Sequence, residues 1–97
     1  MKILITGGCG FIGTALTAHI IKNYKNYKII IIDNFTSSSE KFFKKSIKYF
    51  TKKKINDLKI QIIKGDITNF DLVLKASKKC KIVIHLAAST GVDISIK

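Results

Sequence analysis

The chain of 97 residues contains no proline and only two cysteines, and its six glycines gather at a few positions. No linker-like segment therefore divides it, and its length predicts one small domain or part of a larger one. Cys9 and Cys80 are not part of a C-x-x-C pair, which argues against a metal site or a redox motif. Hydrophobic residues make up 46% of the chain, too many for a disordered segment.

The sequence also lacks an apolar run long enough to cross a membrane. Residues 1–5 superficially resemble the start of a signal peptide, but the glycines between Gly7 and Gly10 interrupt that pattern. We therefore expect a cytoplasmic protein with no membrane partner.

Arginine is absent, and all 18 basic residues are lysines, which give a net charge of +12. A charge of this size is compatible with a nucleic acid or an anionic membrane as partner. Arginine, however, is the residue preferred for bidentate contacts with phosphates and bases. A solvated lysine surface is the favoured interpretation, so we expect no nucleic-acid partner. Nucleic-acid binding through a lysine-rich helix stays as the weaker alternative.

Strands and helices alternate along the chain. Apolar and β-branched runs predict four strands, over residues 2–6, 28–32, 59–64 and 81–86. Helical patterns predict helices over residues 11–24, 39–53 and 69–79, with a further helix beginning near Asp93. The second strand is an apolar run without alternation, which is typical of strands buried on both faces of a parallel sheet. Right-handed crossovers then favour an α/β fold with a parallel sheet in the order 3-2-1-4.

Each predicted helix has an apolar face. Its members are Ile12, Leu16 and Ile20 in the first helix, Phe43, Ile47 and Phe50 in the second, and Leu72, Val73 and Ala76 in the third. Ser38 or Ser39 is expected to cap the second helix, and Thr68 or Asn69 the third. Lysines occupy much of the rest of the second helix, so a membrane-surface helix is the alternative to core packing. Core packing is favoured, because crossover helices in α/β sheets have this pattern.

A glycine-rich segment, Thr-Gly-Gly-Cys-Gly-Phe-Ile-Gly over residues 6–13, joins the first strand to the first helix. Gly7, Gly10 and Gly13 have the spacing G-x-x-G-x-x-G, which is informative in this strand-to-helix context. Gly7 permits a tight turn, Gly10 lets the backbone approach a diphosphate, and Gly13 lets the helix lie close to the sheet. The free N–H groups and the positive dipole end of the helix then predict a diphosphate site.

Asp33 ends the second strand, 20 residues after Gly13 (33 − 13 = 20). An acidic residue at this place meets the adenosine ribose of a dinucleotide, where its carboxylate accepts hydrogen bonds from the hydroxyls. The same carboxylate would repel a 2′-phosphate, so the sequence predicts NAD rather than NADP. A strand-end aspartate that only makes a turn is the alternative interpretation.

Four motifs occur together, in this order: the glycine-rich segment 6–13, Asp-Asn-Phe at 33–35, Gly-Asp-Ile at 65–67 and Val-Ile-His-Leu-Ala-Ala at 83–88. With them the chain resembles the extended short-chain dehydrogenases/reductases, the NAD-dependent epimerases and dehydratases of nucleotide sugars. The resemblance spans essentially the whole chain. It implies a Rossmann-type doubly wound sheet, incomplete here, with residues 1–97 as its N-terminal part and no substrate domain.

The resemblance also implies roles for individual residues. Asp66 would hydrogen-bond the adenine amino group, and Ile67 would pack on the adenine ring. Backbone N–H groups of Phe11 and Ile12 would bind the diphosphate, and Asn34 would help to fix the ribose. The residues that would line the ribose and diphosphate are Leu86, Ala87 and Ala88.

Plainer interpretations exist for several of these side chains. For Asp66 the alternative is a Gly-Asp turn that caps the next helix. His85 is best explained as a strand-end histidine with a satisfied hydrogen bond. Cys9 lies near a helix N-terminus, where the pKa of a thiol can fall, yet it occupies a variable loop position and a reactive role is not expected. Residues 89–92 resemble a substrate-side loop and are equally compatible with a connector.

The family's chemistry is a hydride transfer that uses NAD, a Tyr-x-x-x-Lys pair and a Ser or Thr. Tyr24 with Lys28, and Tyr49 with Lys53, have that spacing, but both precede the strands that the catalytic pair should follow. We therefore expect no catalytic or metal-ligating residue in this chain, with a nucleotide-sugar substrate only in a full-length protein. A non-catalytic NAD-binding module or sensor subunit is the alternative.

The fourth predicted strand has no predicted neighbour on its outer side. An apolar strand with an open edge promotes pairing with other chains. We therefore expect self-association through this edge of the sheet.

Overall fold

The computed structural model describes residues 1–36, 38–86 and 95–96; for residues 56, 95 and 96 it describes the backbone only. Its elements are β1 (Lys2–Thr6), α1 (Phe11–Asn23), β2 (Lys28–Asp33), α2 (Glu40–Thr51), the short 3-10 helix η1 (Ile55–Asp57), β3 (Ile60–Lys64), α3 (Phe70–Ser77), β4 (Cys80–His85) and β5 (Ser95–Ile96). The four predicted strands and three predicted helices are confirmed, with bounds that differ by one or two residues.

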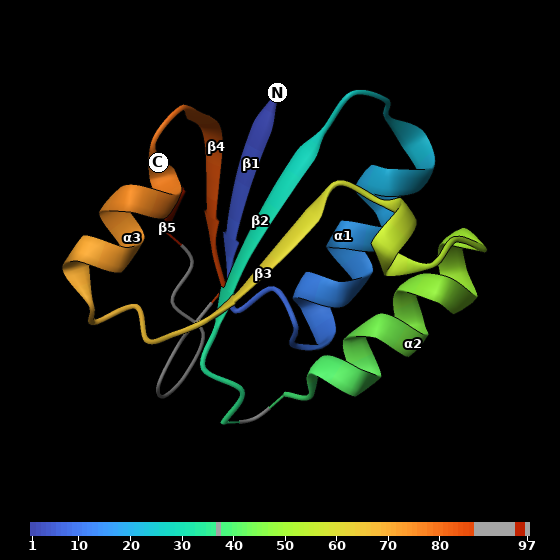
Figure 1. The fold of residues 1–97 in the computed structure, drawn as a ribbon, viewed down its shortest axis with the longest axis horizontal. Helices are drawn as coiled ribbons and strands as arrows, with labels where there is room; N and C mark the ends of the chain where they lie inside the picture. The colour runs from blue at the N-terminus through green and yellow to red at the C-terminus, as the bar shows by residue number, and fades with distance from the viewer. Residues whose placement is uncertain (37, 87–94, 97) are drawn as a thin grey trace.

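The strands form one sheet in the order β3-β2-β1-β4-β5, of which the first four are parallel (Figure 1). The predicted order 3-2-1-4 is confirmed. β5 is antiparallel to β4 and pairs with its last two residues, Ile84 and His85. Residues 95 and 96 are therefore strand and not part of the helix predicted to begin near Asp93, which itself lies outside the described residues. The outer edge of β4 is also partly covered, not fully open.

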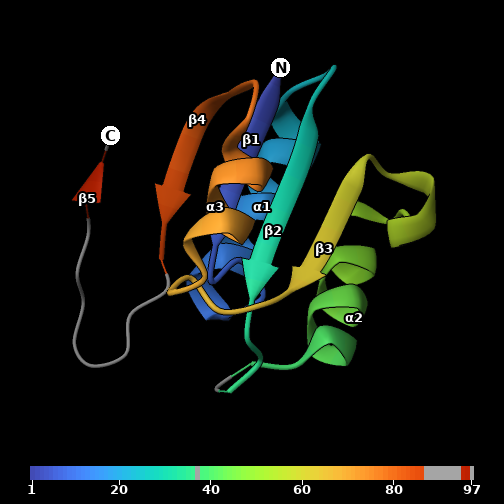
Figure 2. The same ribbon diagram turned by 60° about the vertical axis from the view of Figure 1, so that its left-hand side comes forward.

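Two apolar clusters lie on opposite faces of the sheet, because successive side chains of a strand point to opposite faces. Figures 1 and 2 show α1 and α2 on one face and α3 on the other. The first cluster contains Ile3, Ile5, Ile29 and Ile31 from the strands, with Ala18, Ile20, Phe43 and Ile47 from α1 and α2. The second cluster contains Leu4, Ile30, Ile32 and Ala76. Burial on both faces explains why β1 and β2 are apolar without alternation.

The buried face of α1 differs from the predicted stripe. Ile12 is 67% exposed and Leu16 is half-buried, whereas Ile20 is buried as expected. Small residues make most of the buried face instead: Gly13, Thr14, Thr17 and Ala18 accompany Ile20. Small side chains allow the helix axis to approach the sheet, so the wider Ile12 turns outward.

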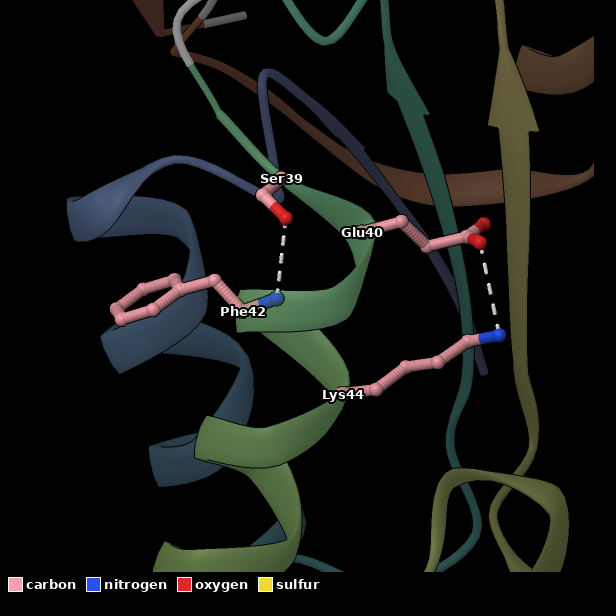
Figure 3. A network of polar contacts seen from close by, with 4 residues as sticks. All are labelled: Ser39, Glu40, Phe42 and Lys44. Atoms are coloured by element: carbon pink, nitrogen blue, oxygen red, sulfur yellow. Dashed lines mark hydrogen bonds and ion pairs between the residues drawn. The ribbon is translucent and has the colours of Figure 1, made fainter.

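The second helix begins as predicted at a serine cap. Ser39 Oγ accepts a hydrogen bond from Phe42 N at 3.2 Å, and Glu40 in the first turn lies 3.6 Å from Lys44 Nζ (Figure 3). Phe43 and Ile47 are fully buried, but Phe50 is 50% exposed and contradicts the predicted stripe. Phe50 lies in the last turn, where its ring packs edge-on against Tyr49 at a centroid distance of 5.2 Å.

The third helix is capped by Asn69, whose Oδ1 accepts a hydrogen bond from Leu72 N at 3.2 Å. Ala76 is buried, and half-buried Leu72 and Val73 pack against the second cluster, as predicted. Among the described helices, none is long and apolar enough to span a membrane.

Candidate functional site

The carboxyl ends of the four parallel strands lie at one edge of the sheet, where their arrowheads point in Figure 1. Backbone hydrogen bonds continue past the strand ends and hold the following loops side by side. Gly7 N donates to Ile32 O at 2.7 Å, Gly65 N to Asp33 O at 3.0 Å, and Leu86 N to Thr6 O at 2.9 Å. The segments that follow β1, β2, β3 and β4 therefore start from adjacent positions. The predicted site residues lie at or directly after these strand ends, or open α1.

The glycine loop joins β1 to α1 through a tight turn. Gly7 has a φ of 70°, in the left-handed region that favours glycine, and its carbonyl accepts a hydrogen bond from Gly10 N at 3.2 Å. A Cβ on Gly10 would have one described neighbour within 4 Å apart from the adjoining residues, Gly7 O at 3.4 Å, which is ordinary van der Waals contact. A Cβ on Gly13 would lie 2.5 Å from Gly8 Cα. The close approach expected at Gly13 is thus to the loop backbone at Gly8.

The first turn of α1 lies at the surface of this edge. Gly10 occupies the N-cap position and provides no side-chain cap. Thr14 N is the first amide of the helical ladder and donates to Gly10 O at 2.9 Å, so the amides of residues 11–13 precede the ladder. The side chains of Phe11 and Ile12 are 85% and 67% exposed. Uncapped amides at the positive end of a helix dipole suit an anion.

The Asp33 carboxylate links the loop after β2 to the glycine loop. The residue is only 7% exposed. Its Oδ2 accepts a hydrogen bond from Cys9 N at 3.0 Å. Its Oδ1 accepts from Phe35 N at 2.9 Å and from Ser38 Oγ at 3.0 Å. The carboxylate therefore fixes two segments that are far apart in sequence.

Phe35 and Asn34 shape the turn that follows Asp33. Phe35 has a φ of 59°, which costs a residue with a side chain about 1–2 kcal/mol relative to the right-handed region. Its half-buried ring packs against the first cluster. Asn34 is exposed, and its Oδ1 accepts hydrogen bonds from Thr36 N at 3.1 Å and Thr36 Oγ1 at 3.0 Å. The packing of the Phe35 ring and the hydrogen bonds accepted by the Asp33 and Asn34 side chains together hold the strained turn.

Cys9 is buried beneath the loop, 1% exposed. Its burial raises the pKa of the thiol from 9.0 to about 12, and the nearby carboxylates of Asp33 and Glu40 add to the rise. The helix N-terminus therefore does not activate this thiol, in agreement with the expectation that Cys9 is unreactive.

Asp66 and Ile67 follow β3. Asp66 is exposed, and its Oδ1 accepts a hydrogen bond from Thr68 N at 2.9 Å. This bond and the Thr68 side chain lower the pKa of the Asp66 carboxyl. The cap of α3 is Asn69, so Asp66 makes a turn without capping the helix. Half-buried Ile67 packs against the second cluster.

His85 and Leu86 lie at the end of β4. His85 pairs with Thr6 across the sheet, and its Nδ1 lies 2.6 Å from Thr6 Oγ1. It is thus a strand-end histidine with a hydrogen-bond partner. Leu86 is half-buried against the first cluster. Ala87, Ala88 and residues 89–92 lie outside the described residues.

The two Tyr-Lys pairs lie away from this edge. Tyr24 follows the last residue of α1, a helix that begins at the site and runs away from it (Figure 1), and its ring packs against Tyr27 at 5.5 Å. Tyr49 lies late in α2, with Lys52 Nζ 5.1 Å from its ring centroid. Within the described ranges, no three His, Cys, Asp or Glu side chains gather as metal ligands.

Sequence reasoning missed two residues of this edge. Gly8 is buried, and a Cβ on it would lie 2.7 Å from the Ile31 side chain. The Gly-Gly doublet at 7–8 was its only signal. The sequence offers Ser38 or Ser39 as the cap of α2; Ser39 takes that role, and Ser38 donates a hydrogen bond to Asp33. A serine five residues after Asp33 carries no local signal for such a bond (38 − 33 = 5).

Solved structures share this fold. A dTDP-glucose 4,6-dehydratase from Bacillus anthracis, in complex with NAD, is 32% identical, with a TM-score of 0.74 over 92% of this chain and 27% of its own. A UDP-glucuronic acid 4-epimerase from Bacillus cereus, in complex with NAD and UDP-4-deoxy-4-fluoro-glucuronic acid, is 35% identical, with a TM-score of 0.70 over 94% of this chain and 27% of its own. The doubly wound, Rossmann-type architecture is therefore confirmed.

Sequence comparison agrees. A dTDP-D-glucose 4,6-dehydratase from Dictyostelium discoideum is 39% identical over 98 residues, 99% of this chain and 21% of that protein. The chain thus spans about a fifth of the length of this relative. The NAD dependent epimerase/dehydratase family matches residues 3–97. Because this match covers nearly every residue, the chain belongs to the NAD-dependent epimerase/dehydratase family.

Proposed function

We propose that this chain is the NAD-binding N-terminal part of a cytoplasmic nucleotide-sugar epimerase or dehydratase. The observation that carries the proposal is the buried Asp33 carboxylate, which accepts a hydrogen bond from Cys9 N inside the glycine loop at 3.0 Å. This bond joins a candidate ribose acceptor to a candidate diphosphate site. Two parts of one dinucleotide would therefore meet adjacent, mutually fixed groups.

The diphosphate would lie at the N-terminus of α1. Gly10 has no side chain, and an added Cβ would have Gly7 O as its one described neighbour within 4 Å apart from the adjoining residues. Phosphate oxygens would therefore find room beside this glycine, where a Cβ would crowd them. The backbone N–H groups of Phe11 and Ile12 precede the helical ladder and would donate to those oxygens. Gly7 and Gly13 would act indirectly, by allowing the tight turn and the close packing that hold the loop in place.

The adenosine ribose would lie at the end of β2. A carboxylate has about four acceptor positions, and the described donors to Asp33 take three of them. A ribose hydroxyl would take the remaining position, and Asn34 would lie beside it. A 2′-phosphate would instead bring negative charge against a mostly buried carboxylate, which favours NAD over NADP.

The remaining cofactor contacts are proposed from the resemblance of these residues to the family's motifs. Asp66 would accept from the adenine amino group, and Ile67 would cover the ring. Leu86, with Ala87 and Ala88, would line the ribose and diphosphate. The bound NAD would supply hydride transfer, and the residues of this chain would bind and orient it.

The activity of a whole enzyme is a further step of the proposal, because the chain spans 21% to 27% of the dehydratases and the epimerase compared above. Those relatives are dehydratases and epimerases of dTDP- and UDP-sugars by name. The nucleotide-sugar substrate and the catalytic Tyr, Lys and Ser or Thr would then belong to residues other than these 97.

Calorimetric titration of the chain with NAD and with NADP tests the cofactor proposal. We expect NAD to bind at least about tenfold more tightly than NADP, a difference of about 1.4 kcal/mol. Replacing Asp33 with asparagine should weaken NAD binding and reduce the ratio of NAD to NADP affinity, because the neutral amide no longer repels a 2′-phosphate. NADP binding as tight as NAD binding to the unmodified chain would refute the assignment of Asp33. Circular dichroism spectra of both proteins provide the folding control.

A further inference from the structure

The Asp33 carboxylate is held by donors from three directions before any cofactor is considered. Two of the three donors are backbone amides, those of Cys9 and Phe35. The third is the Ser38 hydroxyl, which donates to Oδ1 at 3.0 Å. Among the described residues, Ser38 thus provides the one side chain that orients this carboxylate.

The position of Ser38 is itself well defined. It directly precedes Ser39, whose Oγ accepts from Phe42 N at 3.2 Å (Figure 3) and whose carbonyl accepts from Phe43 N at 3.0 Å. The start of α2 therefore fixes the backbone on one side of Ser38. On the other side, the Phe35 turn is held in a left-handed conformation with φ 59°. Strained, over-determined turns of this kind cluster at binding sites.

The two oxygens of Asp33 are not equivalent in this arrangement. Oδ1 accepts from both Phe35 N and Ser38 Oγ, while Oδ2 accepts from Cys9 N. With about two acceptor positions on each oxygen, these two donors fill Oδ1, while Cys9 N is the one donor to Oδ2 among the described residues and leaves that oxygen a second position. The Ser38 bond therefore selects which oxygen stays available to a ligand.

We propose that Ser38 is a positioning residue for the cofactor: it holds Asp33 Oδ1 so that Oδ2 is the oxygen that meets the adenosine ribose. This inference rests on the proposed function. Ser38 acts through Asp33 and makes no direct cofactor contact. Its removal leaves the charge of Asp33 and the two backbone donors in place but empties the second acceptor position of Oδ1, so that Oδ2 is no longer the one oxygen open to a ligand.

A double-mutant cycle tests this role. NAD affinity is measured by calorimetry for the unmodified chain, S38A, D33N and the double variant S38A/D33N. We expect S38A to weaken NAD roughly 3–10-fold, the range of one modest hydrogen-bond contribution. In the D33N background the same replacement should change the affinity less than about twofold, because coupled residues are non-additive. S46A serves as the matched control, since Ser46 lies within α2 and outside the Asp33 network.

A second measurement applies even where D33N does not fold. Titration of S38A with NADP distinguishes a positioning role of Ser38 from a direct cofactor contact. A serine that contacts the ribose directly would also bind a 2′-phosphate, so its loss would weaken NAD and NADP binding alike. We expect S38A to weaken NAD while NADP binding stays the same or tightens, so the ratio of the two affinities falls. S38T, which keeps a hydroxyl, should restore most of the NAD affinity.

Three outcomes would overturn the positioning role: equal NAD affinity for S38A and the unmodified chain, the same loss in both Asp33 backgrounds, or equal losses for NAD and NADP. Thermal unfolding of S38A and S46A distinguishes a purely structural effect from the positioning role. A purely structural effect would lower the unfolding temperature without changing the ratio of the NAD and NADP affinities. Failure of the unmodified chain to bind NAD would refute the proposed function itself and is distinguishable from all three.

Discussion

Replacing Gly13 with alanine should disrupt the packing of α1 against the glycine loop. The added Cβ would lie 2.5 Å from Gly8 Cα, 2.6 Å from Gly8 O and 2.7 Å from Gly8 C. All three atoms are backbone, so no side-chain rotation relieves the contact. Restoring 3.4 Å, the start of ordinary van der Waals contact, requires a separation of 0.9 Å (3.4 − 2.5) between helix and loop.

The cost follows from two opposing effects. Overpacking of a close contact costs about 1–3 kcal/mol, while alanine in place of glycine favours a helix interior by up to about 1 kcal/mol. The contacts at Gly13 are with rigid backbone, so we expect the upper part of the overpacking range and a net loss of about 2 kcal/mol. For a chain of this size, that loss lowers the Tm by roughly 8–16 °C.

The matched control is Gly10→Ala. Gly10 has a φ of −73°, which any residue adopts, and its Cβ would meet only Gly7 O at 3.4 Å. We expect the Tm of this variant to fall by no more than a few degrees, because alanine is a somewhat poorer N-cap than glycine but makes no close contact here. Thermal unfolding followed by circular dichroism compares the two. A Gly13→Ala variant as stable as Gly10→Ala would refute the packing account of the loop.

Other predictions concern stability and association. Because burial raises the pKa of the Cys9 thiol from 9.0 to about 12, the unfolded chain loses this proton first; the stability contribution is complete below pH 9 and is lost as the pH rises toward 12. Raising the pH from 8 to 10 should therefore lower the free energy of unfolding of the natural chain by about 1 kcal/mol more than that of Cys9→Ala, as measured by urea unfolding. Equal losses of stability in the two proteins would contradict the burial of this thiol. Ser39→Ala should cost about 1 kcal/mol by removing the N-cap of α2, whereas equal urea midpoints for this variant and Ser46→Ala would argue against the cap. Ile82 of β4 is 40% exposed, and we propose that this edge self-associates; Ile82→Lys should then shift sedimentation profiles toward monomer, and unchanged profiles would speak against that edge.

The topology was predictable because it depends on patterns that local sequence carries. The apolar segment of β2 is buried on both faces, so its composition alone indicates a central parallel strand. Caps are similarly local: Ser39 and Asn69 each bind an amide three residues ahead. Strand order then follows from the handedness of the crossovers.

The features that the sequence did not predict depend on contacts between distant segments. Ile12 fits a helical stripe but turns outward, because Gly13 brings α1 against the loop at Gly8. The bond from Ser38 to Asp33 requires a turn with Phe35 in a left-handed conformation, which no local pattern for phenylalanine indicates. The strand at 95–96 likewise depends on pairing with β4.

The central claim is that Asp33 and the glycine loop form one NAD site, and amide chemical-shift mapping tests it most directly. Titration of ¹⁵N-labelled chain with NAD should shift the amides of Gly10, Phe11 and Ile12 at the start of α1, together with Cys9, whose N–H donates to Asp33. The lysine-rich face of α2 should stay unchanged. Saturating NAD that shifts none of these loop amides, or shifts confined to α2, would contradict the account.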